Sequence, residues 1–272
     1  MNYRHVYHAG GFADVLKHFI LVELIKCLKQ KDKPFFYLDT HAGCGMYDLS
    51  SVSALKTHEA DAGIKRLQGL SSMPVELLDY LAAVKACQQS AHDYPGSPML
   101  VRQMLRAEDR MALTELHPQE YAALKTLFAH DAQVAISHQD AYQGLKALLP
   151  PIQRRGLILI DPAFEVSDEF DRIIQGLQVA LKRFRQGIYA IWYPIKDRFA
   201  VARFMRQLRA LDQPLLNVTI QPAADTESER LNETGVAIIN PPWQLDVTLH
   251  AAIPKLLQLL SPDGRGRFSV SS

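Results

Sequence analysis

The chain has 272 residues, of which 48% are apolar and 22% are charged, and its net charge is +1. These values indicate a globular protein of one large α/β domain or two small ones, and they exclude a protein that is basic overall. Any nucleic-acid site must therefore be a local patch. The three cysteines lie far apart without a C-x-x-C pair, so we predict neither a disulfide framework nor a zinc site.

The N-terminus is polar and aromatic and lacks the apolar region of a signal peptide. No apolar run approaches the roughly 20 residues that span a bilayer. None of the ten histidines belongs to an H-E-x-x-H motif, and the spacing of His5, His8, His18 and His41 fits no standard zinc motif. We therefore expect a cytoplasmic protein in a reducing compartment, with no membrane segment and no bound metal.

The first part of the chain predicts a helix, a strand and a helical insertion. Apolar residues recur at helical spacing over 13–29, and an apolar run over 35–38 ends at Asp39, as a buried strand does. From residue 46 to about residue 105 the sequence shows helical stretches and no convincing strand. We predict that residues 46–105 form a small insertion subdomain and that residues 1–30 hold an N-terminal motif and helix.

Predicted strands alternate with predicted helices in the rest of the chain. This alternation indicates right-handed βαβ units and a mainly parallel sheet, which binds ligands at the carboxyl ends of its strands. With the strand at 35–38 the sheet has seven strands, and we assign residues 1–45 and 106–272 to its domain. The further strands are 111–115, 134–137, 157–160, 188–192, 215–221 and 236–239, and the helices are 118–128, 142–149, 167–185, 199–211 and 247–260.

Acidic residues follow three successive predicted strands. Asp39 precedes a turn that contains Gly43, and Glu115 ends the next strand. Asp140, followed by Ala141, comes after the third. A glycine turn lets the backbone approach a ligand, and a carboxylate accepts both hydroxyls of a ribose. Because no phosphate-binding lysine accompanies these residues, we predict a nucleoside cofactor, S-adenosylmethionine; the alternative is an ordinary tight turn.

The segment 161–164 (DPAF) is the predicted site of chemistry. An exocyclic amine such as adenine N6 is a poor nucleophile until its hydrogens are accepted, and Asp161 and the carbonyl of Pro162 are suitable acceptors. Phe164 offers an aromatic face on which an extruded base can stack. The usual pattern is [DN]-P-P-[YFW], so Ala163 stands where a proline is common. The alternative is that Asp161 and Pro162 only end a strand.

A second segment, 240–243 (NPPW), matches the four-residue pattern more closely and also follows an apolar strand. We favour Asp161 because its strand comes directly after those of Glu115 and Asp140, which puts it beside the cofactor loop. Asn240 ends the last predicted strand, near the far side of the sheet. Its alternative role is a rigid turn between a strand and a helix.

Over nearly its full length the chain resembles the RlmJ family of 23S ribosomal RNA adenine-N6 methyltransferases. The matches are long and far more specific than the short cofactor motif. They are YRH at 3–5, HAG at 8–10, ADVLKH at 13–18, YLDTHAG at 37–43, YPGSP at 94–98, TELHP at 114–118, RRGLILIDP at 154–162 and NPPW at 240–243.

This resemblance implies a class I S-adenosylmethionine-dependent methyltransferase fold, Rossmann-like and doubly wound, with a small helical insertion. It implies that Asp161 is the catalytic acceptor and that Lys17 and Tyr3 lie near the active site on a mobile N-terminal segment. The residues that it implies for cofactor contact are His18, His41, Ser97, Glu115 and Asp140.

The chain departs from the family pattern at two places. The family has D-P-P-Y where this chain has Ala163 and Phe164, and H-A-G-N-x-A-D where this chain has Gly11 and Phe12. Phe164 keeps the stacking face without the hydroxyl. The change to Ala163 loosens the backbone and puts the rate or the base preference in question.

Two further groups of residues have open interpretations. Trp192 and Tyr193, at a strand end, either line the base pocket or pack in the core. A basic group could bind phosphates or simply form solvated helix faces; its members are Lys182, Arg183, Arg185, Lys196, Arg198, Arg203, Arg206 and Arg209.

Three functions stay open on the sequence. The first is an adenine-N6 methyltransferase of 23S rRNA, acting on protein-free or early-assembly RNA as a monomer or weak dimer. The second is a DNA adenine-N6 methyltransferase or another DNA-handling protein on the same fold. The third is a binding protein that is catalytically impaired by Ala163, although the set Asp39, Glu115, Asp140 and Asp161 argues against it. No residue distinguishes RNA from DNA.

Overall fold

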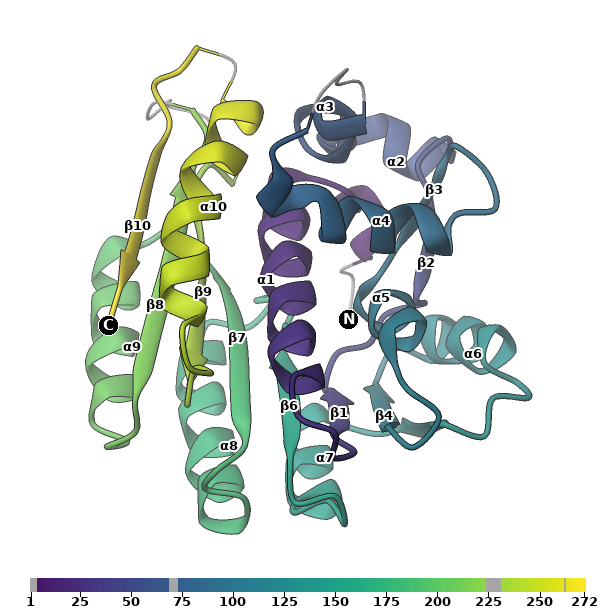
Figure 1. Ribbon diagram of the computed structural model, residues 1–272, viewed down its shortest axis with the longest axis vertical. Helices are drawn as coiled ribbons and strands as arrows, with labels where there is room; N and C mark the ends of the chain where they lie inside the picture. Colours follow the sequence, from purple (N-terminus) through teal and green to yellow (C-terminus); the bar gives the residue numbers. More distant parts are fainter. Residues whose placement is uncertain (1–3, 69–72, 224–230, 262) are drawn as a thin grey trace.

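The computed structural model describes residues 4–68, 73–223, 231–261 and 263–272. Its main sheet has eight strands in the order β10-β8-β9-β7-β6-β1-β4-β5 (Figure 1). The strands are β1 (Phe36–Asp39), β4 (Arg110–Glu115), β5 (Val134–His138), β6 (Gly156–Ile160), β7 (Ile188–Pro194), β8 (Leu215–Gln221), β9 (Thr234–Ile239) and β10 (Arg267–Ser271).

The Rossmann-like fold is confirmed, and each of the seven predicted strands is present. The predicted number of strands is wrong by one, because β10 adds an antiparallel edge strand beside β8. Four of its five residues are exposed. An edge strand in water shows no continuous apolar run, which is the signal that identified the buried strands.

Strand direction divides the sheet into two parts. The strands β5, β4, β1, β6 and β7 run parallel, whereas β9 runs antiparallel to both β7 and β8. The carboxyl ends of β1, β4 and β6 therefore meet at one edge, and the end of β9 lies at the other. There the amide of Asn240 donates to the carbonyls of Arg185 and Gly187, each at 2.8 Å. The competing segment 240–243 is thus a turn remote from Asp161.

Helices cover both faces of the sheet, as a doubly wound fold requires (Figure 1). The buried side chains form two clusters, one on each face. One face carries α1 (Phe12–Lys29), α5 (Ser97–Met104), α6 (Pro118–Leu127) and α10 (Leu245–Leu260). The other carries α7 (Ala141–Leu148), α8 (Glu169–Arg183) and α9 (Arg198–Arg209). Among the described residues, none of the helices is long and apolar enough to cross a membrane.

The helix α1 is buried on every side. The sequence predicts an amphipathic helix, but each residue from Asp14 to Ile25 is buried. The sheet covers one side of α1, and α4, α5 and α10 pack on others. This burial has a consequence for function, because it removes the polar side chains of Asp14, Lys17 and His18 from bulk water.

The insertion packs against α1 and the start of the chain. It contains the helices α2 (Val52–Thr57), α3 (Ile64–Gln68) and α4 (Leu78–Cys87), with the 3-10 helices η2 (Glu59–Ala62) and η3 (Val75–Leu77); η1 (His5–Tyr7) precedes α1. The prediction of no strand over 46–105 is wrong, since β2 (Met46–Asp48) and β3 (Asp93–Pro95) form an antiparallel pair. Three-residue strands are too short to produce a recognisable alternation.

We predict that the all-round burial of α1 makes it the most sensitive helix of the core. Ile20→Ala should lower the free energy of unfolding by about 2–5 kcal/mol, because Ile20 is fully buried and its removal leaves a cavity. Val52→Ala, at a position 76% exposed, is the matched control and should cost less than about 0.5 kcal/mol. Urea denaturation measures both, and equal losses would contradict this packing.

Candidate active site

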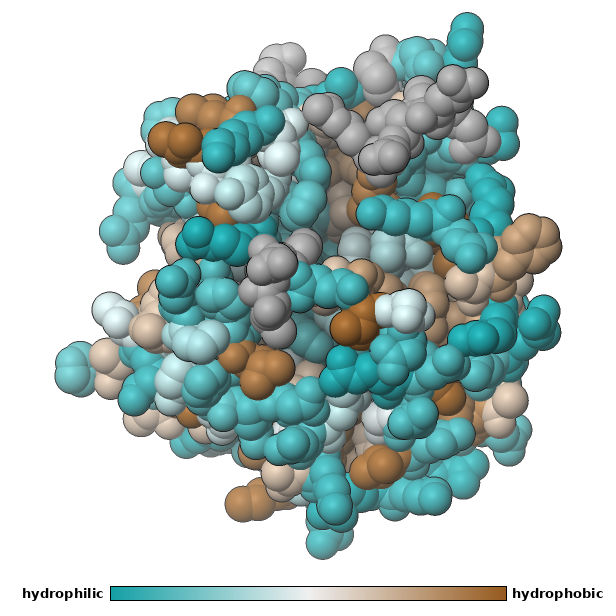
Figure 2. Space-filling view, turned by 180° about the vertical axis from the view of Figure 1, so that it is seen from behind, coloured by the Kyte–Doolittle hydropathy of each residue, from teal (hydrophilic) through white to brown (hydrophobic). Residues whose placement is uncertain are grey.

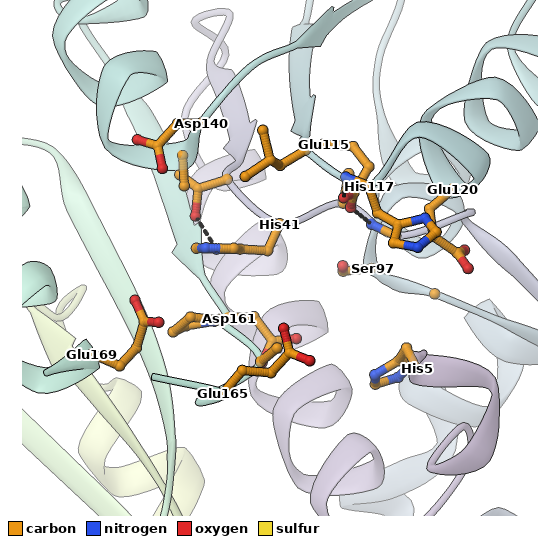
Figure 3. Close-up of a pocket in the computed structure, with 18 of the residues that line it drawn as sticks. His5, His41, Ser97, Glu115, His117, Glu120, Asp140, Asp161, Glu165 and Glu169 are labelled. Atoms are coloured by element: carbon orange, nitrogen blue, oxygen red, sulfur yellow. Dashed lines mark hydrogen bonds between the residues drawn. The ribbon is translucent and has the colours of Figure 1, made fainter. Parts of the chain in front are cut away.

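A pocket opens at the carboxyl ends of β1, β4 and β6, between the start of α1 and the loop before α8 (Figure 3). Its lining contains six carboxylates and two lysine or arginine side chains, which gives a formal charge of 2 − 6 = −4 with the histidines counted neutral. The charged groups are Glu115, Glu120, Asp140, Asp161, Glu165, Glu169, Lys17 and Arg172. Such a pocket repels phosphates and attracts a cationic ligand.

Lys17 ties α1 to the end of β6. Its ammonium group lies 2.8 Å from Asp14 Oδ1 and 2.5 Å from Asp161 Oδ2, and its side chain is only 4% exposed. Burial alone would lower the pKa of Lys17, but the two carboxylates raise it above its ordinary value. Burial would likewise raise the pKa of Asp14, yet His5 and Lys17 hold it well below its usual range. The side chain of His5 contacts Asp14 Oδ2 at 2.9 Å.

The insertion fixes the turn that begins α1. Gly10 has φ +73°, its N–H donates to Asp14 Oδ2 at 3.0 Å, and its carbonyl accepts from Ile64 N at 2.8 Å. A Cβ on Gly10 would lie 2.9 Å from Ile64, so a side chain there would push the turn away. His8 contacts Glu59 of η2 at 2.7 Å. The insertion therefore helps to place Asp14 and Lys17.

Asp39 supports the pocket from behind its wall. It is fully buried, and Oδ2 accepts hydrogen bonds from Tyr37 Oη at 2.7 Å and Ser97 Oγ at 2.6 Å. Burial raises the pKa of Asp39 to about 6. Ser97 lines the pocket whereas Asp39 does not. The first acidic strand end thus positions another pocket residue.

Glu115 holds the glycine turn after β1. Oε2 accepts from Gly43 N and Oε1 accepts from His117 N, both at 2.7 Å, and burial raises the pKa of Glu115. Gly43 has φ +61°, and a Cβ there would lie 2.4 Å from Tyr47 Oη. Only glycine fits this turn without movement. The Nδ1 atom of His117 is buried in the lining and has no hydrogen-bond partner among the described residues.

Asp140 belongs to a network with Arg172. Its Oδ1 caps α7 by accepting from Tyr142 N at 3.0 Å, and its Oδ2 lies 3.1 Å from Arg172. The guanidinium carbon of Arg172 lies 4.8 Å from the centroid of the Tyr142 ring, and the Tyr142 hydroxyl donates to Glu169 at 2.6 Å. The network makes a rigid polar wall, with Ala141 in the lining beside it.

Two histidines of the lining, the buried His18 and the half-buried His41, have lowered pKa values. The ring of His18 contacts the Tyr94 hydroxyl at 2.8 Å, and burial lowers the pKa of His18 to about 3. Burial also lowers the pKa of His41 to about 4, against the opposing charges of Asp161 and Asp140. Figure 3 shows His41 between these two carboxylates. Both rings can therefore donate and accept hydrogen bonds near neutral pH.

The loop after β6 places its first residues in the pocket. Asp161, Pro162 and Ala163 belong to the lining. Phe164 does not, because its ring packs against Phe170 at 5.0 Å and Trp192 at 5.8 Å between centroids. Its φ is +51°, a conformation that a phenylalanine rarely adopts and that is found at functional sites. A base could reach the Phe164 face only beside the pocket, so the stacking role stays a prediction.

The structure gathers most of the predicted site residues around this one pocket. The lining includes Asp161, Pro162, Lys17, His18, His41, Gly43, Ser97, Glu115, Asp140 and Ala141. Tyr3 lies outside the described residues. Their roles stay predictions, since placement alone does not test them.

The sequence analysis gave no role to several lining residues. Arg172, Glu165 and Glu169 come from the loop before α8 or from its first turn, where no motif marks them. Glu120 lies in the first turn of α6. His117 belongs to the matched segment TELHP, which was the one available signal. No group of three or more described His, Cys, Asp or Glu residues is arranged to hold a metal.

The fold and the pocket together define a class I S-adenosylmethionine-dependent methyltransferase. The donor set fits this cofactor: the carboxylates of Glu115 and Asp140, a glycine turn, the unpaired His117 nitrogen and an overall negative lining suit a cationic nucleoside without phosphate.

Comparison with known proteins identifies the family. Residues 32–271 match the family described as "Ribosomal RNA large subunit methyltransferase D, RlmJ". The chain is 41% identical to the ribosomal RNA large subunit methyltransferase J of Escherichia coli K12, over 100% of this chain and 98% of that protein. It is 38% identical to the protein of the same name from Haemophilus influenzae, over 99% and 98%. The chain belongs to the RlmJ family.

A solved structure gives the same result for the fold. The crystal structure of protein LPL1258 from Legionella pneumophila superposes with a TM-score of 0.90 at 34% sequence identity, over 97% of this chain and 98% of that one. The match includes the insertion as well as the sheet, because almost the whole of both chains is covered.

The neutral state of His18 predicts a fold that loses stability in acid. The unfolded chain protonates a histidine below about pH 6.5, whereas the pKa of His18 is about 3 in the folded chain. The stability is therefore complete above pH 6.5 and falls below it. Between pH 7.5 and 5.5, His18 should lower the free energy of unfolding by about 1.4 kcal/mol.

Urea denaturation of the wild type and of His18→Gln at both pH values measures this contribution. The decline on acidification should be smaller in the variant by that amount. The comparison cancels the other titrating groups, including Asp39, whose raised pKa acts in the opposite direction. An identical decline in the two proteins would show that His18 binds its proton over the same pH range in the folded and the unfolded chain, which would contradict the lowered pKa.

Proposed function

We propose that this chain transfers a methyl group to N6 of an adenine in 23S rRNA, and that it acts on protein-free or early-assembly RNA. The observation that supports the proposal most strongly is the position of Asp161, which lies 2.5 Å from a buried ammonium group in the lining of a pocket suited to S-adenosylmethionine. Both curated relatives carry the name of a large-subunit ribosomal RNA methyltransferase.

Four groups of the chain would hold the cofactor. Glu115 would accept the ribose hydroxyls, and the backbone turn at Gly43 would lie against the nucleoside. Asp140 bonds the start of α7 and pairs with Arg172, and these contacts leave some of its lone pairs free. Through these lone pairs it would accept a hydrogen bond from the adenine amino group. His18, His41 and Ser97 line the remainder of the wall. When bound, S-adenosylmethionine supplies a methyl group on a positively charged sulfur, which departs as a neutral thioether.

Asp161 activates and orients the target amine. Lys17 bonds Oδ2 of Asp161, so we assign Oδ1 and the carbonyl of Pro162 to the two N6 hydrogens. Accepting these hydrogens frees the nitrogen lone pair from the ring and points it at the methyl group. As the N–C bond forms, N6 becomes positively charged, and Asp161 is placed to take the proton that it must lose. The charge on Lys17 keeps the carboxylate in this position.

The direct test is methyl transfer from labelled S-adenosylmethionine to protein-free 23S rRNA, with duplex DNA assayed in parallel. Nucleoside analysis by mass spectrometry should find N6-methyladenosine in the RNA and no product in the DNA. Intact 50S subunits should be methylated more slowly than free RNA if the enzyme acts before assembly. Methylation of DNA alone, or of a position other than N6, would overturn the proposal.

We predict that Asp161→Asn separates catalysis from cofactor binding. The amide cannot take the proton of N6 and presents one acceptor oxygen, so kcat should fall by at least about 100-fold. Affinity for S-adenosylhomocysteine, measured by calorimetry, should change by less than about threefold because Asp161 acts on the amine. Asn240→Ala is the control for the competing motif and should keep wild-type kcat. Wild-type kcat in Asp161→Asn together with a large loss of kcat in Asn240→Ala would assign the chemistry to Asn240 instead.

A further inference from the structure

An exposed aromatic ring lies among cations at the start of α9. Phe199 is 90% exposed, and Lys196, Arg198 and Arg203 beside it are also exposed. The buried face of α9 is formed by other residues of the helix, so Phe199 contributes nothing to the core. Arg198 pairs with Glu233 at 2.9 Å, and this ion pair keeps the Arg198 side chain extended at the surface. We call residues 196–203 the α9 entry segment.

The backbone that carries this ring is held by a helix cap. Asp197 caps α9 by accepting from the N–H groups of Phe199 at 2.8 Å and Ala200 at 3.1 Å. The cap has already ordered the backbone of Phe199, so little backbone entropy is lost when the ring binds. Within α8 and α9, which are described in full, the exposed large hydrophobic side chains are Phe199 and Val179. On the side of the molecule opposite to that in Figure 1, hydrophilic residues predominate and hydrophobic ones form small separate groups (Figure 2).

The α9 entry segment leaves the sheet on the active-site side. It follows β7, which pairs in parallel with β6, the strand that directly precedes Asp161. A chain of aromatic contacts joins the two: Phe164 packs on Phe170, whose ring centroid lies 4.7 Å from that of Phe204 on α9.

The charge of the pocket shows why an RNA strand needs this surface. The lining has a formal charge of −4, so the phosphates on either side of the target nucleotide are repelled from it. Only the base can enter, and the flanking backbone must be held outside by cations. The α9 entry segment provides cations together with an aromatic face, the combination that binds unpaired nucleotides by stacking and charge.

We propose that the α9 entry segment is the docking surface for the RNA strand that flanks the target adenine. Phe199 stacks on an unpaired base next to the target, and Lys196 and Arg203 contact phosphates. Arg203 lies 2.7 Å from Asp171, and it would turn from this carboxylate to the RNA at little cost because the pair is exposed. The identity of the partner as RNA rests on the proposed function.

The test measures RNA binding without methyl transfer. The probe is a fluorescein-labelled, unstructured 12-nucleotide RNA that contains adenine, titrated with the full chain in saturating S-adenosylhomocysteine. Phe199→Ala should raise Kd at least about fivefold, since each stacked base contributes strongly to affinity. Phe199→Trp should retain wild-type affinity. Lys196→Ala should reduce the slope of log Kd against log salt by about 0.7, as expected for one lost contact to a single strand.

The matched control is Trp243→Ala. Trp243 is 86% exposed but follows the turn at Asn240, at the opposite edge of the sheet. Trp243→Ala should leave the Kd for RNA unchanged, and calorimetry should give wild-type affinity for S-adenosylhomocysteine in every variant. An unchanged Kd in Phe199→Ala, or an equal loss in Trp243→Ala, would overturn the proposal.

The two proposals can fail separately. If the wild type methylates 23S rRNA but Phe199→Ala binds RNA normally, the docking surface is wrong and the proposed function stands. If Phe199→Ala loses RNA affinity and the wild type methylates no RNA, the surface binds RNA and the proposed function is wrong.

Discussion

The structure depends on one buried ammonium group. Lys17 is almost inaccessible to solvent, and an ammonium in that position is strongly destabilising unless carboxylates surround it. Asp14 supplies one of them from the same helix. Asp161 supplies the other from the loop directly after β6, 144 residues after Lys17 in the sequence. This arrangement makes the start of α1 and the loop after β6 a single unit. Neither can move without leaving a charge unpaired.

The burial of Lys17 explains the insertion. A helix that packed against the sheet alone would leave its outer face in water, and Lys17 would be free to leave Asp161. The helices of the insertion and α10 cover α1, while Gly10 and His8 fasten its first turn to the 3-10 helix η2 and to Ile64. The insertion thus supports the pocket by holding the first turn of α1, and with it Asp14 and Lys17, in place. It lowers the local dielectric in which the ion pair acts, and so strengthens the pair.

The negative charge of the pocket also bears on the two proposed ligands, the cofactor and RNA. The acidic lining favours a cationic nucleoside and repels phosphates, which is why we propose that S-adenosylmethionine and a bare base share this pocket. In the same proposal the RNA backbone finds its cations outside the pocket, at residues 196–203 beyond the neighbouring strand β7.

The sequence predicted the buried part of the fold well, because apolar runs such as 157–160 and the acidic residues that end strands carry their own signal. It predicted neither β10 nor the pair β2 and β3, whose short or exposed strands lack apolar periodicity. In the site, motif residues such as Glu115 were identified because they follow strands. Arg172 was not identified, because an arginine within a predicted helix indicates only a solvent-exposed charge. The fold brings its side chain to Asp140.

Phe164 shows another limit of the sequence. Its aromatic type suggested a stacking face for a base, but the direction of its ring depends on a φ of +51° that no residue pattern predicts. The ring joins Phe170 and Trp192 and becomes part of the support between the loop after β6 and α9. Trp192, for which both a pocket and a core role were open, packs on that ring outside the lining.

The most direct measurement of the central claim is a crystal structure of the chain with S-adenosylhomocysteine and adenosine bound together. The account predicts the adenosine N6 within about 2.6–3.2 Å of both Asp161 and the Pro162 carbonyl, with Lys17 still paired to Asp14 and Asp161. An adenosine amine held by other groups, or a Lys17 that has left Asp161 to bind the nucleoside, would contradict it.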